Sequence, residues 1–116
     1  MGRADFGQAP QEATTRDELV AHFGTTIGFG EVHKWEFTTG GRKLLAFWYC
    51  PYSGRAACYV HAYYYNETNH KWVLFVDRLL EPAKGLSVEI SADHLLVFKD
   101  SDGKIAAEAP LETLPR

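Results

Sequence analysis

The sequence has few of the residues that most directly reveal a function. Its 116 residues include two cysteines and one methionine, and a formal charge of −3 leaves no excess of basic residues. Because phosphate contacts need a basic surface, the composition argues against a nucleic-acid partner. No apolar run approaches the roughly 20 residues of a membrane span, so membrane insertion is not expected. The length fits a single domain.

The five histidines carry no metal-binding spacing. They are His22, His33, His61, His70 and His94. The sequence has no His-x-x-x-His pair and no set of cysteines and histidines at the spacing of metal ligands, and a metal site needs converging ligands. No Gly-x-Ser-x-Gly motif marks a nucleophile. The sequence therefore predicts no metal and no cofactor, and it favours a protein that is not an enzyme.

The beginning of the chain leaves the compartment open. Residues 1–18 are polar and small and lack the apolar segment of a signal peptide. One interpretation is a cytoplasmic protein; the other is a periplasmic or secreted protein from which a signal peptide has been removed. We expect a flexible arm over 1–13, one α+β domain over 14–109 and a short tail over 110–116.

A short helix is predicted directly after the arm. Thr15 and Glu18 form a capping box, in which the Thr15 hydroxyl accepts from the Glu18 amide and the Glu18 carboxylate reaches back. Leu19 and Phe23 supply an apolar stripe, and Gly24 is a suitable C-terminal stop. Because so short a helix is marginal in water, it must be held by packing.

From residue 31 onward, strand-forming and turn-forming segments alternate. The predicted strands are 31–39, 42–50, 56–65, 71–80, 86–91, 94–99 and 104–108. Gly40-Gly41 is a two-residue hairpin signal, and no long helix interrupts the strands, so the sheet is antiparallel. The predicted fold is α+β: a short N-terminal helix packed on a curved antiparallel meander of six to seven strands. A half-barrel or a cystatin-like curl suits this order.

Hairpin pairing assigns the side chains of the central strands to two faces. One is named here the alanine face, after Ala46 and Ala62. Its other predicted members are Trp35, Phe37, Leu44, Trp48, Val60, Tyr64, Trp72, Leu74 and Val76. A five-residue loop at 66–70 places Tyr64 opposite Trp72. Because the alanines are small, we expect the helix to lie across this face.

The opposite face, named here the histidine face after His61, is also too apolar to be left in water. Its candidate binding residues are Phe47, Tyr49, Tyr59, His61, Tyr63 and Phe75. Barrel closure, the C-terminal strands or another protein chain are the three covers considered. Because tyrosine is enriched at interface hot spots, the first hypothesis is a non-enzymatic binding domain that uses this face for a protein partner or a homodimer.

The alternative hypothesis is a small-molecule pocket or an enzyme inside the curled sheet. His61 is predicted to lie among the tyrosines with Asp77 diagonal to it, and a histidine beside a carboxylate can act as an acid or a base. In this alternative, His61 and Asp77 are the catalytic or ligand-binding residues.

The two cysteines lie at the closed end of one predicted hairpin. Cys50 and Cys58 face each other there, with a turn between them. In an oxidising compartment they form a disulfide, and in a reducing one they stay as two buried thiols. Their spacing is not Cys-x-x-Cys, so a redox-catalytic role is not expected.

Overall fold

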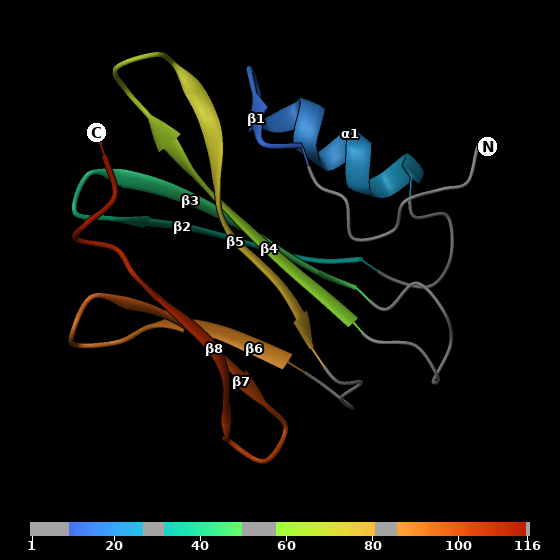
Figure 1. Cartoon of the computed structure of the whole chain (residues 1–116), viewed down its shortest axis with the longest axis vertical. Coiled ribbons are helices and arrows are strands. Elements are labelled where there is room, and N and C mark those ends of the chain that lie inside the picture. Colours follow the sequence, from blue (N-terminus) through green and yellow to red (C-terminus); the bar gives the residue numbers. More distant parts are fainter. Residues whose placement is uncertain (1–9, 27–31, 50–57, 81–85, 116) are drawn as a thin grey trace.

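A computed structural model, which describes residues 10–26, 32–49, 58–80 and 86–115, contains two antiparallel sheets and one helix (Figure 1). In chain order the elements are β1 (Glu12–Ala13), α1 (Arg16–Thr26), β2 (Val32–Thr39), β3 (Arg42–Tyr49), β4 (Cys58–Asn66), β5 (Lys71–Leu80), β6 (Leu86–Ile90), β7 (Leu95–Asp100) and β8 (Ile105–Pro110). The larger sheet has the order β1-β5-β4-β3-β2 and the smaller one β6-β7-β8. The α+β class is confirmed. The single curved meander is wrong, because the strands divide between two sheets.

The pairing of β2, β3 and β4 follows the predicted register. Gly40 and Gly41, with φ values of 58° and 77°, close the first hairpin in a conformation that glycine adopts without strain. Trp35 lies opposite Ala46, and Ala46 lies opposite Ala62. The side chains that these three strands present to each face are therefore those expected from the sequence.

The predicted pairing of β4 with β5 is wrong along its whole length, and a bulge interrupts the observed pairing. Ala62 pairs with Val76, but Tyr63 pairs with Leu74, so Phe75 is the extra residue of β5. One inserted residue exchanges the faces of everything beyond it. The residues that lie on the face opposite to the predicted one are Trp72, Val73, Leu74 and Phe75.

The turn between β4 and β5 explains this difference. Asn66 stays in β4, and its side-chain Oδ1 accepts a hydrogen bond from the Thr68 amide at 2.8 Å. This local bond shortens the loop by one residue relative to the prediction. Tyr64 consequently lies opposite Val73 instead of Trp72.

The smaller sheet covers the alanine face of the larger one. The residues that it and the following segment bury against this face are Leu96, Phe98, Ala107 and Leu111. Figure 1 shows β8 passing beside β5, in agreement with the contacts between these two strands. The alanine face therefore packs against the smaller sheet, and not against the helix that the sequence suggested.

Helix α1 lies on the histidine face. Leu19 and Phe23 are fully buried there against Leu45, Phe47 and Tyr63. The placement follows from β1, which pairs with β5 and is followed at once by the helix. The expectation that the helix lies on the alanine face is thus wrong. The histidine face is covered by α1, and not by barrel closure, the C-terminal strands or another protein chain.

The capping box at the start of α1 is confirmed. Thr15 Oγ1 accepts from the Glu18 amide at 3.2 Å. Glu18 Oε1 accepts in turn from the amides of Thr14 at 2.8 Å and Thr15 at 3.4 Å. The predicted stop at Gly24 is wrong, because the helix continues to Thr26; glycine permits a C-terminal turn without imposing one.

Both ends of the described chain are packed against the domain. Part of the predicted arm forms β1. In the predicted tail, Leu111 is buried, and the Arg42 guanidinium donates to the carbonyl oxygens of Leu114 at 3.0 Å and Pro115 at 2.9 Å. The chain on both sides of the predicted core therefore contributes to it.

Candidate functional site

The predicted binding face is closed in the structure. Phe47, Tyr49, His61 and Tyr63 are each at most 1% exposed beneath α1. Tyr59 is partly exposed at the margin, and Phe75 packs on the alanine face. The prediction that these six residues form an open aromatic face is therefore wrong, because α1 occupies the space in which a partner was expected.

Phe23 is the side chain that closes this face. Its ring centroid lies 4.3 Å from that of Phe47 and 5.4 Å from that of His61, both in stacked orientation. It also lies 5.9 Å from the Tyr49 ring. Rings at these distances gain from their orientation as well as from burial, so α1 is anchored through one aromatic residue set among others.

His61 connects a tyrosine and a carboxylate across three strands. Its Nε2 lies 2.9 Å from the Tyr49 hydroxyl on β3, and its Nδ1 lies 3.1 Å from Asp77 Oδ1 on β5. Asp77 is therefore close enough to act on the ring electrostatically, although Nδ1 makes no hydrogen bond of good geometry. Asp77 lies directly opposite His61 and not diagonal to it, because the shorter turn and the bulge each shift the predicted pairing by one residue.

Burial keeps His61 neutral. Removal from water is the main reason that the pKa of His61 is lowered to about 4; Asp77 opposes this shift, and His22 on α1 contributes to it. A neutral imidazole with Nδ1 protonated can accept from Tyr49 and face Asp77 with its N–H. The arrangement has the order hydroxyl, imidazole, carboxylate, but its hydroxyl and its imidazole are both out of reach of solvent.

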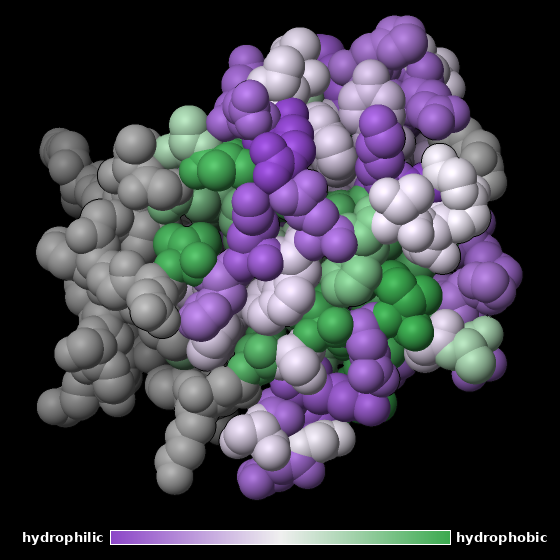
Figure 2. All heavy atoms as spheres, turned by 180° about the vertical axis from the view of Figure 1, so that it is seen from behind, coloured by the Kyte–Doolittle hydropathy of each residue, from purple (hydrophilic) through white to green (hydrophobic). Residues whose placement is uncertain are grey.

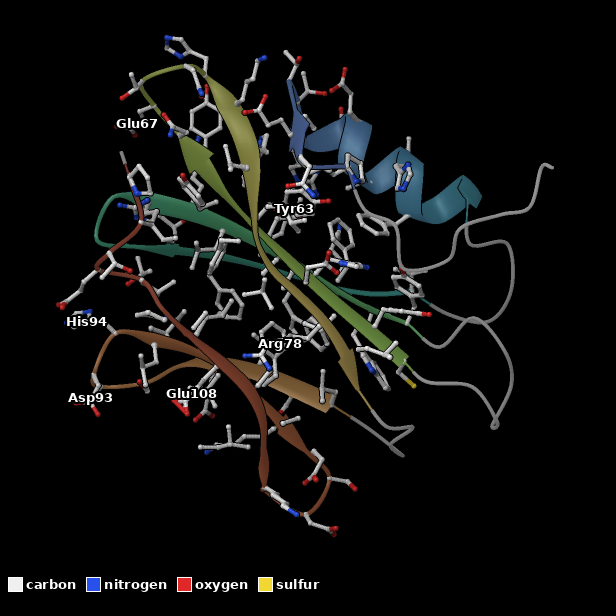
Figure 3. All side chains as sticks on the ribbon, in the orientation of Figure 1. Tyr63, Glu67, Arg78, Asp93, His94 and Glu108 are labelled. Atoms are coloured by element: carbon white, nitrogen blue, oxygen red, sulfur yellow. The ribbon has the colours of Figure 1, made fainter. Side chains whose placement is uncertain are left out.

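Tyr63 is fixed on the same face by a second polar contact. Its hydroxyl donates to the Pro10 carbonyl oxygen at 2.8 Å, and the ring lies between the larger sheet and α1 (Figure 3). Burial raises the pKa of Tyr63 well above its usual value. This hydroxyl therefore remains a donor and holds the chain before β1 against the sheet.

The disulfide candidate lies partly outside the described residues. Cys58 is fully buried at the start of β4 and is not a free thiol. Cys50 falls in the range 50–57, which is outside the described residues. The pairing of the two cysteines stays a prediction.

Strand β2 provides a surface that the sequence reasoning missed. It is the last strand in the order of the larger sheet, so within the described residues no other strand pairs with its outer side. Its pairing with β3 is uninterrupted from the hairpin to Val32. Alternate residues of such a strand direct their backbone groups outward, and these are Val32, Lys34, Glu36 and Thr38, because the closing pair of a two-residue hairpin is hydrogen-bonded.

Charged side chains mark this open edge. The Arg16 guanidinium on α1 donates two hydrogen bonds to the Glu36 carboxylate, one of them from Nε at 3.0 Å. Lys34 Nζ lies 3.3 Å from the same carboxylate. The hydrogen bond from Arg16 is the main reason that the pKa of Glu36 is lowered to about 2. The Lys34 and Glu36 side chains are still 35% and 46% exposed. They are therefore available to a partner at the edge.

Aromatic side chains lie on the other face of the same strand. Trp35 and Phe37 are only partly buried at the margin of the core beneath the alanine face. Figure 2, which shows the molecule from behind, has several hydrophobic patches at the surface between hydrophilic residues. In the sequence, the alternation of aromatic and charged residues in 33–37 marks the two faces of this strand.

Among the open grooves of the described residues are two large ones, and His61 lines neither of them. The first, of about 510 Å³, is lined by Arg16, Glu36, Phe37, Thr38, Lys43, Leu44, Tyr65 and Trp72. The second, of about 460 Å³, is lined by Thr39, Gly40, Arg42, His94, Leu111, Glu112 and Leu114. The first reaches β2, so this groove adjoins the open edge and not the buried histidine.

The described part of the chain has no group of three histidine, cysteine or acidic residues arranged to hold a metal ion. Within the same residues, no helix has the length and apolar character needed to cross a membrane. Comparison of the chain with protein-family models, curated proteins and solved structures finds no match. The function must therefore be argued from the chemistry of the two regions just described.

Proposed function

We propose that this protein is a non-enzymatic interaction domain that binds another polypeptide in extended conformation along β2. The observation that carries the proposal is the open edge: eight residues of regular strand with no strand on their outer side among the described residues. Unpaired strand edges are templates for an added strand, and several peptide-binding domains use them in this way. The binding role expected from the sequence is kept, and its surface moves from the histidine face to β2.

The side chains of β2 support recognition as well as pairing. Backbone bonds to an added strand are independent of its sequence, so selectivity must come from side chains on alternate positions. On one face β2 offers Trp35 and Phe37, which are partly exposed aromatic residues. On the other it offers Lys34 and Glu36, one charge of each sign. A partner strand with one aromatic or aliphatic face and one charged face would complement both faces of β2.

A proline substitution on the outer side of β2 tests the proposal. Thr38→Pro removes an outward amide, which an edge strand tolerates because that amide has no partner in the sheet. We expect a random ten-residue peptide library, displayed on phage, to yield peptides that bind the unchanged protein and bind Thr38→Pro at least about tenfold more weakly.

The matched control is Ser101→Pro, in the exposed turn between β7 and β8, where the Gly103 amide bonds to the Asp100 carbonyl oxygen and proline suits the second position. It should leave peptide binding unchanged. Selection of peptides that bind Thr38→Pro and the unchanged protein equally well, or of none at all, would contradict the proposal. Amide NMR spectra establish that each variant is folded.

A second candidate function is acid–base or ligand chemistry at His61 and Asp77. The observation in its favour is the alignment of Tyr49, His61 and Asp77, with a neutral imidazole between a hydroxyl and a carboxylate. It requires α1 to move, since His61 is completely buried. A fragment screen by NMR would support it if ligands shift the His61 ring signals and His61→Gln abolishes their binding.

A further inference from the structure

We infer that the polypeptide that adds to β2 is a second copy of this chain, paired antiparallel with a twofold axis at Trp35. This inference rests on the proposed function and names the occupant of the same edge. It starts from the spacing of charges on β2: Lys34 and Glu36 stand one position before and one after Trp35. Two such strands, run in opposite directions, bring the lysine of each opposite the glutamate of the other.

The backbone geometry selects the same register. Lys34 and Glu36 both direct their amide and carbonyl groups outward, as do Val32 and Thr38. With Trp35 on the axis, Lys34 lies opposite Glu36 and Val32 opposite Thr38, so every outward residue meets an outward residue. Such a contact is isologous and closes on itself, as twofold interfaces require.

Neighbouring registers are disfavoured by charge. Moving one strand by a single residue sets outward backbone groups against inward ones. Placing the axis at Lys34 sets two lysines opposite each other, and placing it at Glu36 sets two glutamates opposite each other. Like charges directly opposite are destabilising. Charges on an edge strand usually prevent association, and here they also leave one register in which association is favoured.

The other face of β2 is compatible with this pairing. With the axis at Trp35, that residue meets its own copy, and Phe37 meets His33 of the second copy. Aromatic residues opposite each other are among the favourable cross-strand pairs. His33 already lies against the Trp48 ring, with centroids 4.8 Å apart, so Phe37 would extend an existing aromatic row.

Charge reversal tests the inference in the full chain. By analytical ultracentrifugation we expect the unchanged protein to dimerise as its concentration rises. Lys34→Glu and Glu36→Lys should each raise the dissociation constant by about tenfold or more, because each sets like charges opposite each other. An equimolar mixture of the two variants should recover dimers, since every pair in the mixed dimer is again of opposite charge.

The matched controls are Lys104→Glu and Asp102→Lys, which reverse one charge of each sign in the exposed turn between β7 and β8. Both should dimerise as the unchanged protein does. Dimers that resist both β2 variants, or no recovery on mixing folded variants, would overturn the inference. A chain that stays monomeric at millimolar concentration would also overturn it.

A second measurement uses the unchanged protein, because Glu36→Lys also removes the contact with Arg16. The amides of Lys34, Glu36 and Thr38 should gain protection from hydrogen exchange as concentration rises, whereas those of Trp35 and Phe37 are already bonded to β3. Protection that does not alternate contradicts the register. If the monomer binds displayed peptides in a Thr38→Pro-sensitive manner without dimerising, this inference fails and the proposed function stands.

Discussion

The two faces of the larger sheet are both covered by the chain itself, but their covers differ in kind. The alanine face meets a second sheet, and its contacts are almost entirely apolar. The histidine face meets a single helix, and beneath it lie hydroxyl and imidazole groups that bond to one another or to backbone. A sheet surface lined with alanine accepts another sheet closely, whereas rings of unequal size leave a hollow into which one aromatic residue of a helix fits.

This difference locates the candidate chemistry of the molecule. The buried polar groups belong to the helix-covered face, where each has a defined neighbour. The unpaired backbone belongs to β2, where the described chain supplies no cover. Aromatic density alone does not separate these two cases, because a dense aromatic stretch serves a core as well as an interface.

The largest expected effect is on the helix cover itself. Phe23→Ala should destabilise the protein by about 3–5 kcal/mol, because it empties the space between Phe47 and His61. Urea unfolding, followed by circular dichroism, measures this change. Phe98→Ala, in the cover of the alanine face, is the matched comparison and should cost a similar amount.

The number of unfolding transitions shows whether the two covers belong to one cooperative unit. We expect one cooperative transition for both, since the two covers enclose the same sheet. A Phe23→Ala protein that loses its helix signal early, and unfolds its sheets later with unchanged midpoint, would show that α1 is a separable cover.

Acidification should weaken the histidine face selectively. The pKa of His61 is lowered to about 4, below the usual 6.5, so the unfolded chain binds this proton first. Stability is therefore unaffected above pH 6.5 and falls by about 1.4 kcal/mol per pH unit between 6.5 and 4, to a total of about 3 kcal/mol. Urea midpoints at pH 7, 5.5 and 4.5 measure it.

His61→Gln is the reference for that pH series, because it removes the titrating ring while the carboxylates common to both proteins cancel. Its stability should decline less than that of the unchanged protein over this window. Glu36 does not interfere: with a pKa lowered to about 2, its contribution is lost only below about pH 4.5. Parallel pH curves for the two proteins would refute a buried neutral His61.

Removing one hydroxyl group tests whether the polar chain on this face is structurally required. Tyr49→Phe should cost about 1–3 kcal/mol, because it leaves His61 Nε2 buried without its donor. Tyr65→Phe is the control, since its hydroxyl makes only a 3.4 Å contact with His70 in an exposed position. Equal effects of the two changes in thermal unfolding would mean that the histidine needs no partner.

The extent to which the sequence predicts these features depends on how local the determining contacts are. The capping box and the β2–β3 hairpin rest on residues three or four apart, and both are confirmed. The bulge at Phe75 and the side on which α1 lies depend on pairing between distant segments. A turn one residue shorter than predicted exchanged the faces of Trp72 and the residues beside it, and the bulge restored the predicted faces from Val76 onward; no local propensity signals such a bulge.

The features of the candidate site also differ in whether local or distant contacts determine them. The proximity of His61 to Tyr49 follows from the β3–β4 register, which the hairpin fixes. Its burial does not, because burial depends on where a helix 40 residues earlier in the chain comes to rest. The open edge at β2 likewise appears only once the order of the strands is known.

The smallest expected effect concerns how α1 begins on the histidine face. Thr15→Ala removes the hydroxyl that accepts from the Glu18 amide and should cost about 1 kcal/mol, the usual value of an N-cap. Thr14→Ala is the matched control, because only the backbone amide of Thr14 takes part in the capping box, and it should leave the unfolding midpoint nearly unchanged. Since Phe23 anchors the far part of the helix, the Thr15 variant should fray at its start without exposing His61. Amide exchange that becomes faster throughout β4 as well as at residues 16–18 would show instead that the N-cap stabilises the whole helix on the sheet. Phe23 would then not be sufficient to hold α1 on the histidine face.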